Sequence, residues 1–169
     1  ASAHGGAVLS PISLVFMIDR SGSMQGENGG TQNLAVRWNP VKSGLSTFFA
    51  DPASSNVSAS LSFFPIGGGQ SPDCNFQHYM APTVALTQLP NGAAFSNAFA
   101  QGPDGMTPTF AALKGAIETA KTIKAGGKNA AVVLATDGEP RGCEKEGNTI
   151  TNIEKVAAEE MTVLVRGET

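Results

Sequence analysis

The sequence predicts one α/β domain: a doubly wound, three-layer sandwich with a central, mostly parallel sheet between helices. Three observations predict it. Short apolar runs bounded by turn residues alternate with segments of helical period. The chain of 169 residues has room for a single domain. No apolar run approaches the roughly 20 residues of a membrane-spanning helix, while a hydrophobic content of 41% is too high for a disordered chain.

The strand predictions come from two kinds of pattern. Residues 12–18 and 130–135 are nearly continuous apolar runs, which indicates central strands buried on both faces. Residues 57–63 alternate between apolar residues and serines, which predicts a half-exposed strand at an edge of the sheet. Weaker patterns predict a short edge strand within residues 83–89 and the start of a late strand at residues 162–165.

Amphipathic helical patterns separate these strands and occupy residues 41–49, 91–100, 110–120 and 151–161. Thr107 is expected to cap the helix over residues 110–120, with Pro108 at its first position. This order of elements predicts a Rossmann-like sheet with one antiparallel edge strand. Ligands of such sheets bind beyond the carboxyl ends of the strands.

Composition narrows the classes of partner. The net charge is -3, from 11 basic and 14 acidic residues, and the basic residues do not cluster. The sequence therefore predicts no basic patch that would bind nucleic acid or an anionic membrane. Only 15% of the residues are charged, and the many small polar residues are typical of exported proteins. Residues 1–10 are small and predict a flexible start, as in a trimmed, mature exported chain. We therefore expect a secreted or cell-surface protein whose core spans residues 12–165 of a single domain, 1–169.

The two cysteines, Cys74 and Cys143, lie far apart and without CxxC spacing, which argues against a zinc site or a redox dithiol. Both lie in polar loop sequence, which favours a structural disulfide formed in an oxidising compartment. The alternative is a pair of unpaired, buried thiols.

Oxygen-bearing side chains follow both predicted central strands. Asp19, Ser21 and Ser23 form an Asp-x-Ser-x-Ser sequence after the first strand, where alternate residues can project oxygens toward one point. Asp137 follows the second strand, and Thr107 supplies a hydroxyl before a predicted helix. The three segments offer neither His nor Cys. The set therefore suits Mg²⁺, Mn²⁺ or Ca²⁺ and not zinc.

This set resembles the metal-ion-dependent adhesion site of a von Willebrand factor type A domain. The three loops of that site are matched in order by Asp19, Ser21 and Ser23, by Thr107, and by Asp137. The likeness covers residues 12–165 in order and spacing. Residues 40–65 and the loop at 72–75 are also similar to secreted bacterial members of the family.

The resemblance implies an extracellular protein-binding or adhesion module that is not an enzyme. In this family the two serines and the threonine bind a divalent cation through neutral hydroxyls, directly or through water, and the second aspartate often acts through water. Asp19 would then be the one direct carboxylate, leaving about one positive charge for a Glu or Asp carboxylate of a partner protein. Mg²⁺ is the expected ion, with Ca²⁺ or Mn²⁺ as alternatives.

Other interpretations remain open at this point. The serine loop and Asp137-Gly138 could be ordinary turns, and Thr107 could be a helix cap as well as a ligand. An enzyme lacks support, because Ser21 stands where a phosphotransferase has a second acid and no His is placed to activate a serine. An intracellular type A domain that serves an ATPase or a metal-insertion complex would have the same metal site.

Family members usually continue past the strand expected near Thr162, so C-terminal elements of the fold are expected to be missing. The resemblance leaves two alternatives open: a truncated chain, or a sheet that another chain completes by strand addition, as in a surface filament.

Overall fold

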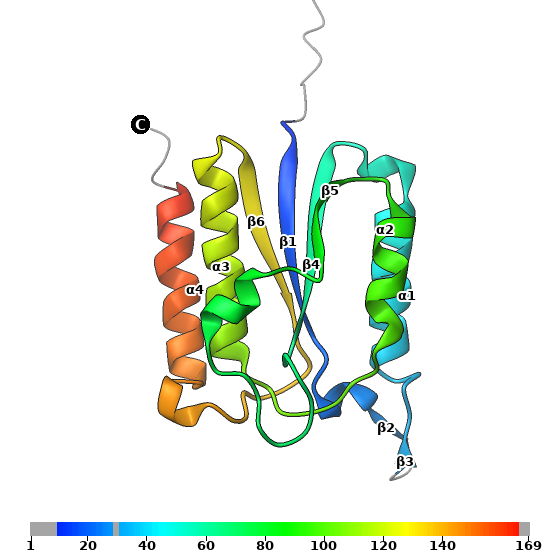
Figure 1. Ribbon diagram of the computed structural model, residues 1–169, viewed down its shortest axis with the longest axis vertical. Coiled ribbons are helices and arrows are strands. Elements are labelled where there is room, and N and C mark those ends of the chain that lie inside the picture. The colour runs from blue at the N-terminus through cyan, green and yellow to red at the C-terminus, as the bar shows by residue number, and fades with distance from the viewer. Residues whose placement is uncertain (1–9, 29–30, 166–169) are drawn as a thin grey trace, which may run out of the picture.

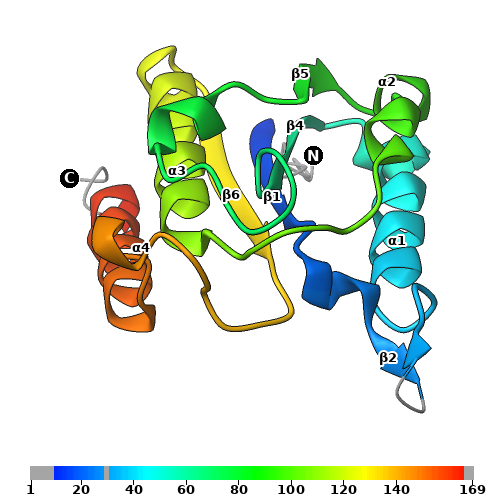
Figure 2. The ribbon, with the colours of Figure 1, turned by 60° about the horizontal axis from the view of Figure 1, so that its bottom comes forward.

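The computed structural model describes residues 10–28 and 31–165 and has the predicted α/β fold (Figure 1). A sheet of four strands lies between two layers of helices. The turned view in Figure 2 shows the same three layers. Nearly all of the start that was predicted to be flexible, residues 1–10, lies outside the described residues.

The main sheet has the strand order β5-β4-β1-β6. β1 (Ile12–Asp19) runs parallel to β4 (Val57–Phe64) on one side and to β6 (Asn129–Ala135) on the other. β5 (Val84–Gln88) lies within the predicted edge strand at residues 83–89, and it pairs with β4 in the antiparallel sense. Because three strands are parallel, their carboxyl ends meet at one edge, at the bottom of Figure 1.

Two predicted strand positions are wrong. β4 lies inside the sheet, and its serines Ser60 and Ser62 are buried, not solvent-facing. They share a strand face with Phe64, which belongs to the second apolar cluster described below. Serine is small enough to pack on that face, so alternation of serine with apolar residues did not mark exposure. β6, expected to be central, forms an edge of the sheet within the described residues, and most of it is half-buried.

Helices cover both faces of the sheet. α1 (Trp38–Ala50) and α2 (Gly92–Ser96) lie on one face and α3 (Thr109–Ala125) on the other, while α4 (Ile150–Val165) packs against α3 (Figure 1). Each face has its own apolar cluster. The first contains Phe16, Ile18, Trp38, Phe49, Leu61, Phe63 and Phe95, and the second contains Val15, Met17, Phe64, Tyr79, Ala112 and Ala116.

Short elements complete the fold. Single 3-10 turns span Gly22–Gln25, Pro52–Ser54, Phe76–Met80, Asn97–Ala100 and Glu144–Glu146. The glycine-rich stretch after the serine loop contains a small antiparallel pair, β2 (Glu27–Asn28) and β3 (Thr31–Gln32).

Two local predictions need correction. Thr107 does not cap α3, which begins at Thr109 with Pro108 in the capping position and without a side-chain cap. Residues 162–165 belong to the last turn of α4, so the late strand expected there is wrong. No Gly or Pro interrupts α4, so the helix can continue to Val165. Each further helical residue adds a backbone hydrogen bond, and this gain outweighs the strand preference of three β-branched residues.

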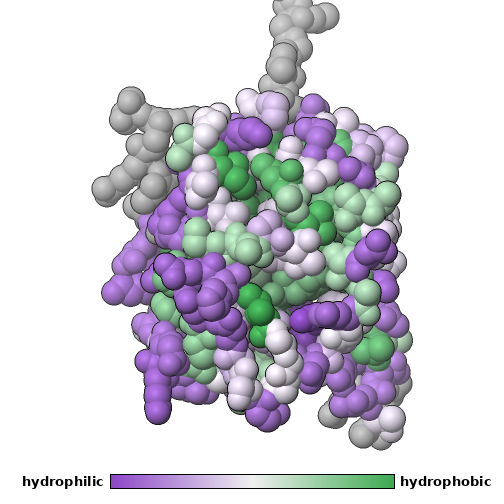
Figure 3. Space-filling view, in the orientation of Figure 1, coloured by the Kyte–Doolittle hydropathy of each residue, from purple (hydrophilic) through white to green (hydrophobic). Residues whose placement is uncertain are grey.

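The surface agrees with a compact sandwich. On the face drawn in Figure 3, hydrophilic side chains predominate over the flank formed by α3 and α4, and apolar ones gather toward the middle. None of the helices in the described ranges combines the length and the apolar character needed to cross a bilayer.

Candidate metal centre

The register of the sheet brings the ends of β1 and β6 together. Ile18 pairs with Ala135, so the next residues, Asp19 and Thr136, lie side by side at the carboxyl edge. The Thr136 hydroxyl donates a 2.6 Å hydrogen bond to Asp19 Oδ2. Asp19 itself is completely buried. The first strand therefore ends in a carboxylate that is fixed on its neighbour and shielded from bulk water.

The serine loop folds back over this carboxylate. The Ser21 backbone N–H donates to Asp19 Oδ1 at 2.7 Å, and the hydroxyl oxygens of Ser21 and Ser23 lie 3.0 Å apart. The Gly22 N–H donates to the Gly105 carbonyl at 2.9 Å, which ties this loop to the loop that carries Thr107. Alternate residues of the Asp-x-Ser-x-Ser sequence thus place their oxygens close together, as predicted.

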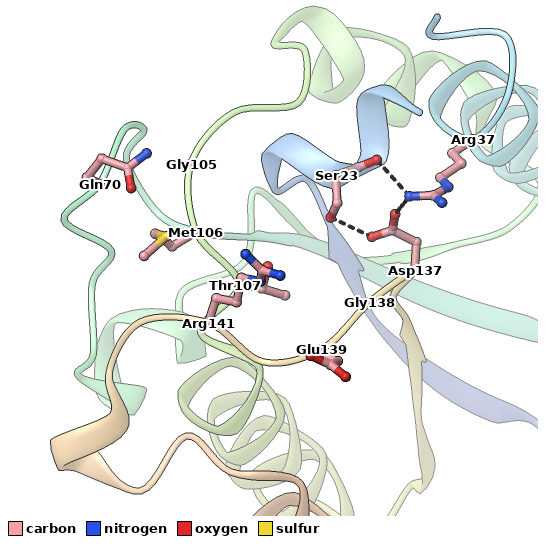
Figure 4. A pocket seen from close by; sticks show the side chains of 10 residues that line it. All are labelled: Ser23, Arg37, Gln70, Gly105, Met106, Thr107, Asp137, Gly138, Glu139 and Arg141. Atoms are coloured by element: carbon pink, nitrogen blue, oxygen red, sulfur yellow. Dashed lines mark hydrogen bonds and ion pairs between the residues drawn. The ribbon is translucent and has the colours of Figure 1, made fainter. Parts of the chain in front are cut away.

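Asp137 joins the same hydrogen-bonded chain from the end of β6 (Figure 4). The Ser23 hydroxyl donates to Asp137 Oδ1 at 2.8 Å. The other oxygen, Oδ2, forms an ion pair with Arg37, whose Nη1 also donates to the Ser23 carbonyl at 3.0 Å. Both carboxylate oxygens of Asp137 therefore have a protein partner.

Thr107, on the loop before α3, lines a pocket together with Ser23 and Asp137 (Figure 4). Its backbone is fixed by a two-way bridge to Arg141, with N···O distances of 3.0 and 2.9 Å. Its side chain is nearly buried, and its hydroxyl has no hydrogen-bond partner within the described part of the chain. The pocket is lined by Ser23, Arg37, Gln70, Gly105, Met106, Thr107, Asp137, Gly138, Glu139 and Arg141 (Figure 4).

Burial disfavours the charged form of Asp19. Burial raises the pKa of Asp19 above its ordinary value of 3.8, hydrogen bonds from Thr136 and Ser21 oppose that rise, and the nearby Asp137 carboxylate adds to it. Asp137 has Arg37 as a counter-charge, whereas Asp19 forms no ion pair among the described residues. A buried carboxylate without a cationic partner is electrostatically costly.

The donor set fits a hard divalent cation. Carboxylate and hydroxyl oxygens of Asp19, Ser21, Ser23, Thr107 and Asp137 gather at one edge of the sheet, and neither His nor Cys is among them. Oxygen ligands of this kind suit Mg²⁺, Mn²⁺ or Ca²⁺. The folded chain thus assembles the predicted residues, and their binding of a metal stays a prediction.

The loop that follows Asp137 is braced by a disulfide and an asparagine. Cys74 and Cys143 form the predicted disulfide, and so they are not available as thiolate ligands beside Glu146. The buried Asn148 side chain donates to the carbonyls of Thr107 and Gly142 at 2.9 and 2.6 Å and accepts from a backbone N–H of α3 at 2.9 Å. These bonds hold the second and third loops against each other.

Sequence reasoning missed three residues that shape the site: Thr136, Arg37 and Asn148. Thr136 could have been found, because it directly follows a strand that runs beside the one ending in Asp19. Arg37 and Asn148 gave no local signal, since their partners lie 100 and 41 positions away. Glu139 also lines the pocket and is exposed.

Comparison with known proteins gives a likeness at the level of the fold. Neither a scan against protein-family models nor a search of curated proteins finds a match. Among solved structures, the chain is similar to a pilus adhesin, SpaC from Lactobacillus rhamnosus GG, with a TM-score of 0.59 and 24% sequence identity. The similarity covers 78% of this chain and 16% of the adhesin chain, so it spans a small part of the adhesin's length.

Proposed function

We propose that this chain is a von Willebrand factor type A domain that binds a divalent cation, and through it a partner protein, outside the cell. The observation that carries the proposal is the convergence of five oxygen-bearing side chains from three separate segments at the carboxyl edge of the sheet. Ligand binding at this edge is the general rule for open α/β sheets.

Each side chain has a distinct part in the proposed site. Asp19, buried and oriented by Thr136, supplies the direct negative charge. Ser21, Ser23 and Thr107 supply neutral hydroxyl oxygens. Asp137 has both oxygens engaged by Ser23 and Arg37, which favours contact through water.

A cation in this donor set keeps about one positive charge uncompensated and would attract a carboxylate. A Glu or Asp side chain of the partner would supply that carboxylate. Mg²⁺ is the ion we favour, with Mn²⁺ and Ca²⁺ as alternatives. This chemistry requires neither a nucleophile nor a general base, and we therefore propose a binding function and not an enzymatic one.

Two observations support an extracellular setting. The Cys74–Cys143 disulfide is typical of oxidising compartments and argues against the intracellular alternative of an ATPase or metal-insertion subunit. The structural similarity to a pilus adhesin supports adhesion as the role and a surface location. A surface filament completed by strand addition remains a second candidate, favoured by the position of β6 at an edge of the described sheet.

Calorimetric titration of the metal-stripped protein with Mg²⁺, Mn²⁺ and Ca²⁺ tests the proposal. We expect one site that is lost in Asp19→Ala and retained in Asp104→Ala, a matched change on the neighbouring loop, where Asp104 accepts from the Gly69 N–H at 3.1 Å. A folded wild-type chain that binds none of the three ions would refute the proposed function.

A further inference from the structure

Arg37 is the one charged side chain, among the described residues, that forms an ion pair with an acidic member of the proposed metal site. Its Nη1 bridges the Asp137 Oδ2 and the Ser23 carbonyl, so a single guanidinium nitrogen contacts the first and third loops together (Figure 4). The site therefore contains a positive charge that belongs to the protein itself.

The base of this side chain is held firmly. Arg37 directly precedes α1, and the next residue, Trp38, is buried with its ring packed 6.2 Å from that of Phe63 and 6.3 Å from that of Phe99. The Val41 N–H donates to the Arg37 carbonyl at 3.3 Å. The side chain is 45% exposed. Arg37 thus reaches over the pocket from a rigid helix start, with its guanidinium at the boundary between protein and solvent.

Two consequences follow for a cation bound by Asp19, Ser21 and Ser23. The guanidinium neutralises Asp137, which removes negative charge that would otherwise attract the ion. It also adds a positive charge close to the ion. Two like charges that lie close together repel each other even near the surface of a protein.

We propose that Arg37 is a tethered positive charge that lowers the affinity of the site for divalent cations and holds Asp137 as an outer, water-mediated ligand. This inference rests on the proposed metal site. The Arg37 charge would leave the bound ion with uncompensated positive charge, which a carboxylate of the partner then neutralises. The site thereby binds the metal more weakly, and the bound metal binds the partner's carboxylate more strongly.

The test compares the affinity of metal-stripped protein for Mn²⁺ alone in four forms: wild type, Arg37→Gln, Arg37→Lys and Arg141→Gln. Glutamine removes the charge and retains a hydrogen-bond donor, while lysine retains the charge. Arg141 lines the same pocket but forms no ion pair within the described ranges, so it controls for a general loss of positive charge.

We expect Arg37→Gln to bind Mn²⁺ about five to ten times more tightly than wild type at low salt, with the gap narrowing at high salt. Arg37→Lys should stay within about twofold of wild type, and so should Arg141→Gln. Thermal unfolding without metal checks that all four forms are folded.

Unchanged or weaker Mn²⁺ binding by Arg37→Gln, beside normal binding by wild type, would overturn this inference and leave the metal site intact. Tighter binding by Arg37→Lys as well would also overturn it, because the gain would then not come from charge. Absence of Mn²⁺ binding in every folded form would overturn the proposed function together with this inference.

Discussion

The Ser23 hydroxyl donates a 2.8 Å hydrogen bond to the carboxylate of Asp137, a residue 114 positions further along the chain. The bond joins the loop after β1 to the loop after β6. It brings together two of the three segments that the sequence marked as carriers of oxygen ligands.

This bond makes Ser23 a sharp test of the site. Replacing it with alanine removes one hydroxyl ligand, so we expect the Mn²⁺ affinity to fall by about 10- to 100-fold. The matched control is Ser60→Ala in β4, whose buried hydroxyl has no hydrogen-bond partner among the residues that the structure describes. That variant should bind Mn²⁺ normally and unfold at the same or a higher temperature, since an unsatisfied buried polar group is removed. Equal metal affinity in both variants would exclude Ser23 as a ligand.

Asp19 should show opposite effects on stability and on metal binding. Burial raises its pKa, so the ionised form destabilises the metal-free fold, and the free energy of unfolding falls as pH rises from 3.8 through the raised folded-state pKa. Asp19→Asn removes that charge, and its amide can accept from the Ser21 N–H and donate to the Thr136 hydroxyl. We expect a metal-free melting temperature a few degrees above that of wild type, with metal binding abolished.

Thermal melts across pH check the Asp19 prediction. The wild-type melting temperature should decline relative to that of Asp19→Asn as pH rises across this window. A variant less stable than wild type at neutral pH, in the absence of metal, would contradict the electrostatic argument.

Two helical glycines should respond oppositely to alanine. A Cβ at Gly115 in α3 would lie 2.6 Å from both the Phe76 carbonyl oxygen and the Tyr79 Cβ. We expect Gly115→Ala to lower the free energy of unfolding by about 1–3 kcal/mol through overpacking. Within the described part of the chain, a Cβ at Gly44 in α1 meets nothing within 4 Å apart from adjacent residues and the helix's own backbone, so Gly44→Ala should raise the free energy of unfolding by about 0.5–1 kcal/mol. Urea unfolding measures both, and a stabilising Gly115→Ala would show that α3 does not pack this closely.

Because of the disulfide, we expect the stability of the fold to depend on the redox state of the solution. Cys74 and Cys143 close a loop with a sequence separation of 69, and such a bridge stabilises a fold by up to about 4 kcal/mol. We expect the double variant Cys74→Ser, Cys143→Ser to lose about 2–4 kcal/mol and the wild type to melt lower in reductant. The melting temperature of the double variant should not respond to reductant. Two titratable thiols in the native, oxidised wild type would show that the bridge does not form.

The sequence predicted the fold class, and it indicated which oxygen-bearing side chains follow the central strands, because both depend on local signals. Apolar runs marked β1 and β6, and the residues directly after them had to meet at one edge of a parallel sheet. The same reasoning placed β4 wrongly, since serines that pack beneath neighbouring elements look like exposed residues in a single sequence.

Long-range partners could not be predicted in this way. Arg37 reaches the site because Trp38 anchors the start of α1, and Asn148 reaches Thr107 because the chain turns back after the disulfide. Tertiary packing decides such contacts, and no spacing within the sequence encodes them. The helical continuation over residues 162–165 likewise depended on the absence of a helix breaker more than on the strand preference of its residues.

Anomalous diffraction from crystals grown with Mn²⁺ would show directly whether these oxygens hold a metal. We predict one strong peak, about 2.0–2.3 Å from the hydroxyl oxygens of Ser21 and Ser23 and from one Asp19 oxygen, with Asp137 in the outer shell beside Arg37. A map at saturating Mn²⁺ without a peak among these residues would contradict the proposed metal centre, and so would peaks confined to exposed carboxylates elsewhere.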